Sequence, residues 1–202
     1  MDGLNRFVKA VEDKVLATVI LLGISPWLLL IAIGVKLSSR GPVFYRQERM
    51  SWNGTCFYMY KFRSMPVDAE TVTGAVWAKP DDDRTTRFGR FLRRTSLDEL
   101  PQLWNVLTGD MSLVGPRPHA LGSQAGNKYF WEVDAKYWQR HCLKPGLTGL
   151  AQVRGHRGAT EEEKDLTDRL QSDLEYISGW SLRRDIEIVL QTVLVLKHDN
   201  AF

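Results

Sequence analysis

An uncharged stretch of 21 residues, "VLATVILLGISPWLLLIAIGV" at positions 15–35, decides how this chain meets its surroundings. As a straight helix it would measure about 31 Å, which matches the hydrocarbon core of a bilayer. Pro26 lies at its middle, where a proline removes one backbone hydrogen bond and clashes with the carbonyl four residues earlier. The sequence therefore predicts a kink or break at Ser25 and Pro26, with the Ser25 hydroxyl satisfying part of the freed backbone.

The charges around this stretch leave its membrane topology open. Basic residues lie on both sides: Arg6, Lys9 and Lys14 before it, and Lys36, Arg40, Arg46 and Arg49 after it. A spanning helix usually has excess positive charge on one side only, so the pattern favours a hairpin that enters and leaves through one leaflet. A proline-kinked spanning helix is the alternative. The run is too long for a cleavable signal peptide, so we expect a retained membrane anchor at residues 1–40 and a second domain at residues 41–202.

The composition is that of a globular protein with an uneven charge. The 202 residues are 44% hydrophobic and 25% charged, and the net charge is +3. Five arginines fall within positions 84–94, which suggests an anionic partner: phospholipid, nucleotide phosphate or nucleic acid. Cys56 and Cys142 have no metal-ligand spacing, so a zinc site is not expected and a reducing, cytoplasmic setting is the plain interpretation.

The rest of the chain predicts an α+β fold that is mainly helical. Aromatic and β-branched residues flank the Asn53-Gly54 pair, which predicts a β-hairpin over residues 43–61. Arginines recur mainly every three residues over positions 84–94, with apolar residues between them, which predicts a basic amphipathic helix suited to a membrane surface. Further helical patterns cover residues 100–107, 161–180 and 185–196. The predicted fold thus has one small β element.

An acidic pair, Asp98 and Glu99, lies in the stretch "RRTSLDELPQLWNV". One explanation is structural, because Ser96 to Glu99 spells the S-x-x-E pattern of a helix capping box. Pro101 weakens it, since the proline would then fall beyond the first helical turn. If the helix instead begins near Asp98, the helix dipole depresses the pKa of that carboxylate and attracts phosphate and magnesium. From the residues alone, capping remains the commoner role for such a pair.

Three basic residues are candidate phosphate ligands. Arg117 lies between two prolines in Gly115-Pro116-Arg117-Pro118, so its backbone is stiff and its guanidinium suits bidentate phosphate binding. The alternative is an ordinary turn arginine that faces solvent. Lys61 and Arg63 lie at the end of the predicted hairpin.

These stretches together resemble the monotopic phosphoglycosyl transferases, and in particular the catalytic domain of undecaprenyl-phosphate glucose and galactose phosphotransferases. The similarity runs along nearly the whole chain. It rests on the Ser25-Pro26 pair and, in order, on "SSRGPVFYRQERM", "YKFRSM", "TRFGRFLRRTSLDELPQLWNVLTGDMSLVGPRP", "LKPGLTGLAQVRG" and "DLEYISGWSLRRDIEIVLQT". Each motif alone is weak, whereas the ordered set is specific.

The resemblance implies a reaction and roles for these residues. Asp98 would attack the sugar-linked phosphorus of a UDP-sugar, release UMP and carry a phosphosugar, which undecaprenyl phosphate would then accept. Magnesium would be bound partly by Asp98, and Glu99 would assist with metal or proton handling. Arg117 would hold phosphate, with Lys61, Arg63 and Arg94 as weaker candidates. The product would begin an exopolysaccharide, capsule or O-antigen unit.

The resemblance also implies a location and partners. A re-entrant hairpin at Ser25 and Pro26 would hold the site against membrane lipid at the cytoplasmic face of the bacterial inner membrane. The expected partners are the sugar nucleotide and the lipid phosphate, with no nucleic acid. The identity of the sugar and the oligomeric state stay open. Many relatives carry a further membrane bundle and soluble domain, so the chain is expected to be a short form or an excised catalytic domain.

Two other functions compete with this interpretation. A non-enzymatic membrane-surface protein would bind acidic lipid or nucleic acid through the arginine-rich helix, with salt-sensitive affinity and no turnover. An ordinary glycosyltransferase would use the same donor and release UDP in place of UMP.

Overall fold

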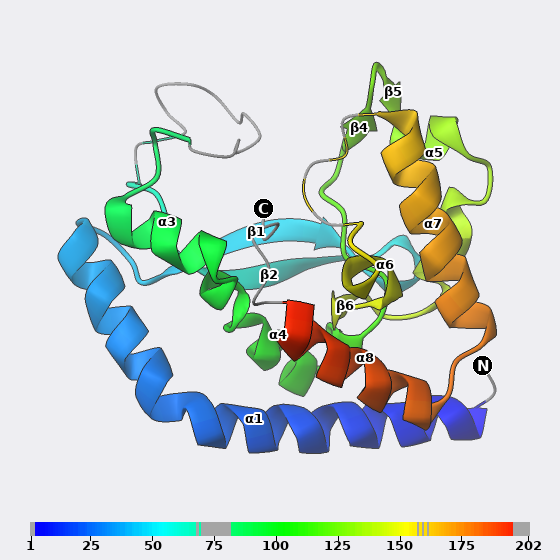
Figure 1. The fold of residues 1–202 in the computed structure, drawn as a ribbon, viewed down its shortest axis with the longest axis horizontal. Helices are drawn as coiled ribbons and strands as arrows, with labels where there is room; N and C mark the ends of the chain where they lie inside the picture. Colours follow the sequence, from blue (N-terminus) through cyan, green and yellow to red (C-terminus); the bar gives the residue numbers. More distant parts are fainter. Residues whose placement is uncertain are drawn as a thin grey trace.

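The computed structural model describes residues 3–67, 69, 82–156, 158, 160 and 162–195. Figure 1 shows one long helix, α1, running along an edge of the molecule, with the remaining elements on one side of it. The longer helices are α1 (Gly3–Ser38), α3 (Arg87–Arg94), α4 (Gln102–Thr108), α7 (Glu163–Ser178) and α8 (Leu182–Val195). The short helices are η1 (Trp52–Gly54), η2 (Leu97–Glu99), α5 (Phe130–Val133), η3 (Tyr137–Cys142) and α6 (Leu150–Val153). The strands are β1 (Phe44–Met50), β2 (Cys56–Phe62), β3 (Ser112–Val114), β4 (Gln124–Ala125), β5 (Lys128–Tyr129) and β6 (Gly146–Thr148).

Helix α1 continues through Pro26 and bends near its middle (Figure 1). Proline deprives the carbonyl of Leu22, four residues earlier, of its usual donor. The Ser25 hydroxyl donates to that carbonyl at 2.9 Å, so the expected role of Ser25 is confirmed. Of the two expected outcomes at Pro26, the kink is confirmed and the break is wrong, because the chain bends without leaving the helix. The helix is long and apolar enough to cross a membrane, with a mean hydropathy of 2.5 over its most apolar window. The re-entrant course stays a prediction.

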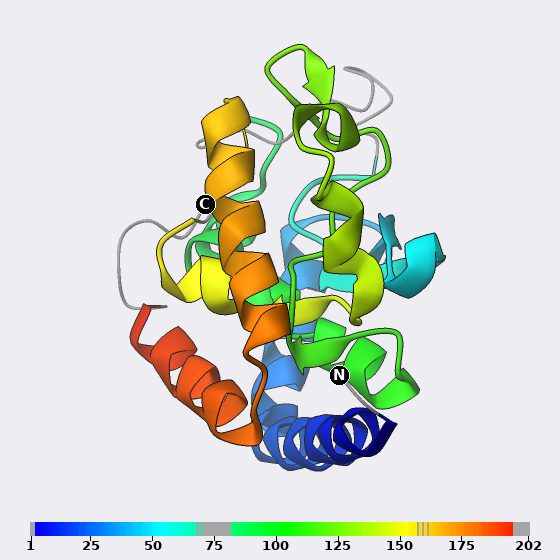
Figure 2. The same ribbon diagram turned by 90° about the vertical axis from the view of Figure 1, so that its right-hand side faces the viewer.

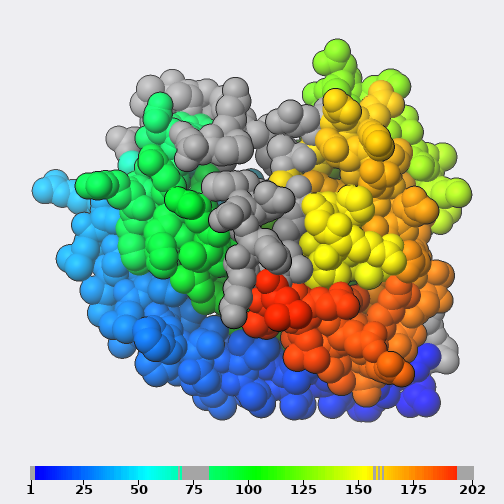
Figure 3. Space-filling view, viewed as in Figure 1, coloured from blue at the N-terminus to red at the C-terminus, as the bar shows by residue number. Residues whose placement is uncertain are grey.

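Both halves of α1 pack against the rest of the chain. In the first half, Lys9 pairs with Asp185 of α8 at 2.6 Å, and Asp13 accepts hydrogen bonds from the Ser112 hydroxyl at 2.7 Å and the Leu113 N–H at 2.9 Å. In the second half, Val35 is fully buried beside residues of β2 and α3. Figure 3 shows α1 and α8 side by side along one edge of the surface. The division at residue 40 stays a prediction, and the two segments share one packed interface.

The predicted hairpin is confirmed. Strands β1 and β2 pair antiparallel, from Phe44 opposite Phe62 to Met50 opposite Cys56. Asn53 and Gly54 both have positive φ, 53° and 73°, which is the backbone that this residue pair favours. The inner face of the hairpin buries Phe57 and Met59 in the main core, and its far end carries Lys61 toward the segment between α3 and α4.

The prediction of a single β element is incomplete, because the described residues form three two-stranded sheets. Strands β4 and β5 are antiparallel, and β3 and β6 are a short parallel pair. The parallel pair brings two glycines together so closely that a Cβ on Gly146 would lie 2.1 Å from the Gly115 nitrogen. Glycine at position 146 therefore allows the segment that holds Arg117 to lie against β6.

The predicted helices exist with shifted ends. The arginine-rich helix begins at Arg87, because the Thr86 hydroxyl caps it by accepting from the Gly89 N–H at 2.9 Å. Helices α4, α7 and α8 correspond to the patterns at 100–107, 161–180 and 185–196, of which Glu161 and Leu196 lie outside the described residues. In Figure 2, α7 extends away from α1 toward the opposite side of the molecule, and α8 lies beside α1. The mainly helical α+β fold is confirmed, whereas contact of α3 with a membrane stays a prediction.

Candidate active site

The acidic pair lies in η2, the short turn between α3 and α4. Ser96, just before it, has a left-handed backbone with φ of 54°. Within the described residues 96–108, the Ser96 side chain makes no capping hydrogen bond, so the capping-box explanation is wrong. Pro101 directly precedes α4, where a missing N–H costs little. Asp98 and Glu99 therefore lie in η2, before α4 begins. The expectation that they lie in the first turn of the helix that follows is wrong.

Glu99 is held by two cations. Lys61 donates to Oε1 at 2.7 Å, and the Arg117 guanidinium donates to Oε1 at 2.5 Å and to Oε2 at 3.1 Å. Burial opposes ionisation of the carboxyl group, but the Arg117 and Lys61 charges prevail and hold the pKa of Glu99 well below its usual range. Two of the predicted phosphate ligands thus meet at the predicted dyad, in contact with Glu99.

Asp98 lies in different surroundings. The residue is 7% exposed, and its carboxylate makes no hydrogen bond or ion pair with any residue that the structure describes. Burial raises the pKa of Asp98 to about 6, against the opposing charge of Lys61, and the Glu99 charge adds to the rise. The expectation of a depressed pKa is therefore wrong, because desolvation outweighs any helix dipole here. At pH 7 the group is still about nine tenths ionised.

The other two predicted phosphate ligands lie elsewhere. Arg63 is buried and donates to the carbonyls of Ser39, at 2.7 Å, and Arg40, so it closes the carboxyl end of α1. Arg94 is exposed on α3. Its neighbour Arg93, which sequence reasoning did not select, donates to the Ser64 hydroxyl at 2.8 Å and carries a charge that acts on Asp98. Helix periodicity could have distinguished the two, because adjacent positions point to different faces.

The backbone around Arg117 is fixed from two sides. Gly115 donates to the Thr148 carbonyl, and Gly146 donates to the Pro116 carbonyl, both at 2.9 Å. On the other side, Arg140 of η3 donates to the Arg117 carbonyl at 2.7 Å. Arg140 in turn pairs with Asp173 of α7 at 2.8 Å. Sequence reasoning missed Arg140 and Asp173, and the one available signal was the presence of Asp173 in the "DLEYISGW" motif.

The dyad offers a partial magnesium site. Among the described residues, no group of three or more histidine, cysteine or acidic side chains could hold a metal ion. Magnesium often takes only one or two carboxylates, with water and substrate phosphate oxygens completing its shell. Asp98 fits this pattern because its carboxylate is unengaged, whereas the Glu99 oxygens are occupied by Lys61 and Arg117.

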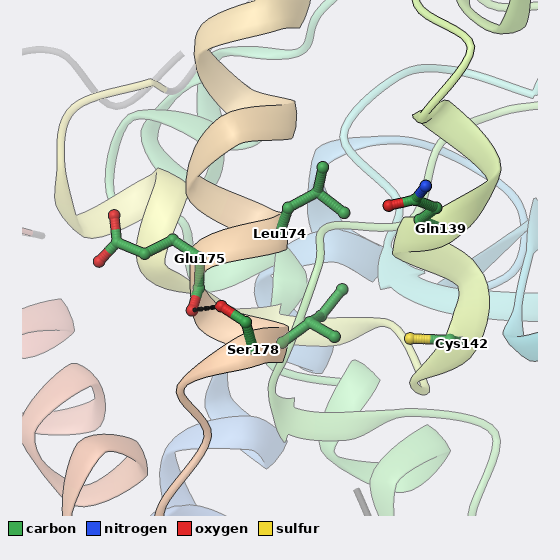
Figure 4. Close-up of a pocket in the computed structure, with 6 residues that line it drawn as sticks. Gln139, Cys142, Leu174, Glu175 and Ser178 are labelled. Carbon is green, nitrogen blue, oxygen red and sulfur yellow. Dashed lines mark hydrogen bonds between the residues drawn. The ribbon is translucent and has the colours of Figure 1, made fainter.

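A hollow of about 600 Å³ lies between η3 and α7, away from the dyad. In Figure 4, Gln139 and Cys142 face Leu174 and Ser178 across it, while the Glu175 carboxylate points away. The lining is mostly apolar and holds none of the predicted site residues. The hollow lies where η3 and α7 meet. Its lining residue Gln139 precedes Arg140 in η3, and its lining residue Leu174 follows Asp173 in α7.

Comparison with known proteins identifies the family of this chain. A sequence profile described as "Bacterial sugar transferase" matches residues 4–199. The chain belongs to this family, whose members are phosphoglycosyl transferases.

Three relatives show how far the similarity reaches. The UDP-glucose:undecaprenyl-phosphate glucose-1-phosphate transferase of Xanthomonas campestris pv. campestris is 51% identical over 205 residues, covering 100% of this chain and 42% of that protein. The protein of the same name from Caulobacter vibrioides is 48% identical over 195 residues, covering 96% of this chain and 72% of that protein. The exopolysaccharide production protein PSS of Rhizobium leguminosarum bv. phaseoli is 47% identical over 174 residues, covering 86% of this chain and 87% of that protein. The chain thus spans less than half the length of the Xanthomonas relative.

Proposed function

We propose that this protein transfers a sugar-1-phosphate from a UDP-sugar to undecaprenyl phosphate, giving UMP and the diphosphate-linked lipid, the first membrane step of a polysaccharide unit. The observation that carries the proposal is the pairing of one unengaged buried carboxylate with one that holds two cations beside it. The names of the relatives support the substrate classes. Two of the three are glucose-1-phosphate transferases, so UDP-glucose is the first donor to test.

In the first step, an oxygen of the Asp98 carboxylate attacks the phosphorus that carries the sugar. The bond from that phosphorus to the bridging oxygen of the diphosphate breaks, and UMP leaves with the electron pair. A phosphosugar remains on Asp98. Burial supports this role because it removes water from the carboxylate, and no neighbouring cation in the described residues engages the attacking oxygens.

In the second step, an oxygen of undecaprenyl phosphate attacks the same phosphorus. The bond to the Asp98 oxygen breaks, and the free carboxylate returns. Two anionic substrates therefore never react directly with each other. Lys61 and Arg117 stabilise the charge on the transferred phosphate, and Glu99 fixes both cations in position. The resemblance implied metal or proton handling by Glu99, which stays a prediction; its contacts with Lys61 and Arg117 support the positioning role proposed here. Magnesium bound at Asp98 would neutralise phosphate charge.

The product assay separates this function from its rivals. Purified protein in lipid is incubated with UDP-glucose, undecaprenyl phosphate and Mg²⁺, and nucleotide release is measured. We expect UMP. Release of UDP would indicate an ordinary glycosyltransferase, and salt-sensitive lipid binding without turnover would indicate a surface-binding protein. Asp83→Asn, at an exposed aspartate before α3, is the control variant and should release UMP at the parent rate.

The membrane arrangement is part of the proposal: α1 is a re-entrant anchor that keeps the site at the cytoplasmic face of the inner membrane. Its bend at Pro26 and its contacts with the rest of the chain support this arrangement. A cysteine introduced by Asn5→Cys should resist a membrane-impermeant thiol reagent in intact cells. In Pro26→Ala, which favours a straight helix by about 3 kcal/mol, part of the population should become reactive. Strong labelling in the parent would instead indicate a spanning helix.

A further inference from the structure

One buried guanidinium lies between α7 and the backbone of the segment that carries Arg117. Arg140 and Asp173 are each 3% exposed, and both Nε and Nη2 of Arg140 donate to one Asp173 oxygen, at 3.0 and 2.8 Å. The same Nη2 donates to the Arg117 carbonyl at 2.7 Å. Asp173 therefore orients a side chain whose remaining donors face the Arg117 segment.

A third contact fixes a histidine in the same cluster. Nη1 of Arg140 lies 3.0 Å from Nδ1 of His119, two residues after Arg117. A guanidinium has donors only, so Nδ1 must accept and the proton of the neutral ring must be on Nε2. Burial, followed by the Arg140 charge, lowers the pKa of His119 well below its usual value, in agreement with a neutral ring. Arg140 thus holds the chain at both Arg117 and His119.

This anchoring bears directly on the Arg117 side chain. Prolines 116 and 118 have no N–H, so the backbone of this segment is fixed largely through its carbonyls. The Pro116 carbonyl is held by Gly146, and the Arg117 carbonyl is held by Arg140. From that fixed backbone, the Arg117 guanidinium reaches both oxygens of Glu99. A shift of the backbone would alter this bidentate geometry and the position of the charge beside Asp98.

We propose that Arg140, oriented by Asp173, is a positioning residue that fixes Arg117 against Glu99 for phosphate transfer. The inference rests on the proposed function for its activity readout. The rival explanation is that the pair only stabilises the fold. The two explanations can be separated, because replacing both members of a buried ion pair by apolar residues is often neutral or stabilising, whereas removing one member is strongly destabilising.

The decisive variant is the double substitution Arg140→Met with Asp173→Leu. It removes both charges of the buried pair, so thermal melting should stay near that of the parent, but no described residue then donates to the Arg117 carbonyl. We expect UMP release to fall by about 100-fold, the loss typical of a reacting group misplaced by an ångström. A folded double variant with parent activity would overturn the proposal. Arg154→Met is the matched control. Arg154 also pairs with an acidic residue of α7, Glu175, but at an exposed site.

Two further measurements keep the test decisive if the double variant does not fold. Arg140→Lys retains a charge for Asp173 but cannot reach all three acceptors, and it should lose about tenfold in UMP release. In an Arg117→Lys background, the further loss from Arg140→Lys should shrink to about twofold or less, because the two residues act through one contact. Full additivity of the two losses would contradict the proposal.

A chemical readout does not depend on the proposed reaction. Phenylglyoxal modifies free guanidinium groups, and peptide mass spectrometry gives the rate at Arg117. This rate should rise in Arg140→Lys and stay at the parent level in Arg154→Met. If the parent releases no UMP, the proposed function fails, while a faster rate at Arg117 in Arg140→Lys still supports positioning. An unchanged rate in Arg140→Lys would overturn the positioning role whatever the protein catalyses.

Discussion

Asp98 and Glu99 are neighbours in the chain and lie in opposite surroundings. Glu99 faces Lys61 and Arg117, which hold the pKa of its carboxyl group well below the usual range. Asp98 is buried, with no hydrogen bond or ion pair to the residues that the structure describes, and its pKa rises to about 6. The comparison shows that two adjacent carboxylates can differ in pKa and contacts, because the folded surroundings of each side chain set these properties. One carboxylate holds two cations, and the other makes no hydrogen bond or ion pair with the described residues.

The two surroundings also have opposite effects on stability. An ionised Glu99 stabilises the folded state, because its partners are fixed beside it in that state. An ionised Asp98 destabilises the folded state, because the charge is poorly solvated there. Active sites commonly accept such a cost for reactivity. The predictions below address this contrast, beginning with the largest effect.

Asp98→Asn should lower UMP release by about 10⁴-fold or more, as removal of a nucleophile does elsewhere. The same change should raise stability at pH 7. The folded pKa lies above the ordinary value of 3.8, so ionisation costs folding free energy above about pH 6, by roughly 1–3 kcal/mol at 1.36 kcal/mol per pKa unit. Below about pH 4 the advantage should disappear. Activity assays and thermal melting at pH 7 and pH 4 measure both effects; a less stable, active variant would contradict the assignment.

Glu99→Gln should lower both activity and stability. The amide leaves Lys61 and Arg117 without a counter-charge, so we expect about 100-fold lower UMP release through misplaced cations. Loss of charge-assisted hydrogen bonds should cost about 2 kcal/mol at pH 7. Because the folded pKa is depressed, this contribution is present above the ordinary pKa of 4.5 and is lost in acid. A variant more stable than the parent at neutral pH would show that the contrast with Asp98 is wrong.

The pH profile of turnover should show the ionisation of Asp98. UMP release should rise with pH and reach its half-maximum near pH 6, because only the carboxylate attacks. The Lys61 charge lowers the pKa of Asp98, so Lys61→Met should move the midpoint to higher pH. Initial rates of UMP release at saturating substrate, measured from about pH 3 to pH 8, give the midpoint. A midpoint near pH 4 in the parent would mean that Asp98 is not desolvated.

Ser96→Gly should have the smallest effect. Ser96 has a left-handed backbone, which glycine adopts without the cost of about 1 kcal/mol that a Cβ incurs. We expect a slight gain in stability and nearly unchanged turnover. A capping box would instead predict a loss, so chemical denaturation of the variant also tests whether the turn before Asp98 and Glu99 is described correctly.

The sequence predicted features that depend on local chemistry. The Asn53-Gly54 pair identified the hairpin, and Pro26 with Ser25 identified the bend in α1 and the group that satisfies its carbonyl. It also selected Asp98, Glu99, Lys61 and Arg117, which the fold brings together. These predictions succeeded because turn geometry and proline chemistry act over a few residues.

Features that depend on tertiary packing were not accessible in the same way. Burial reversed the expected direction of the Asp98 pKa, and the fold placed Arg63 at the end of α1 and away from the dyad. The contact between Arg140 and Asp173 joins residues 33 positions apart. The parallel pairing of β3 with β6 involves segments too short to show a periodicity.

Trapping the phosphosugar on Asp98 tests the central claim most directly. The protein is incubated with a UDP-sugar and Mg²⁺ without lipid acceptor. Its intact mass is measured, and fragmentation mass spectrometry of its peptides, prepared in acid, assigns any adduct to Asp98 or Glu99. The account predicts a mass increase of one sugar phosphate on the peptide with Asp98, none on Glu99, and removal of the adduct by undecaprenyl phosphate. An adduct on Glu99, or rapid UMP formation with lipid and no adduct at any time, would contradict it.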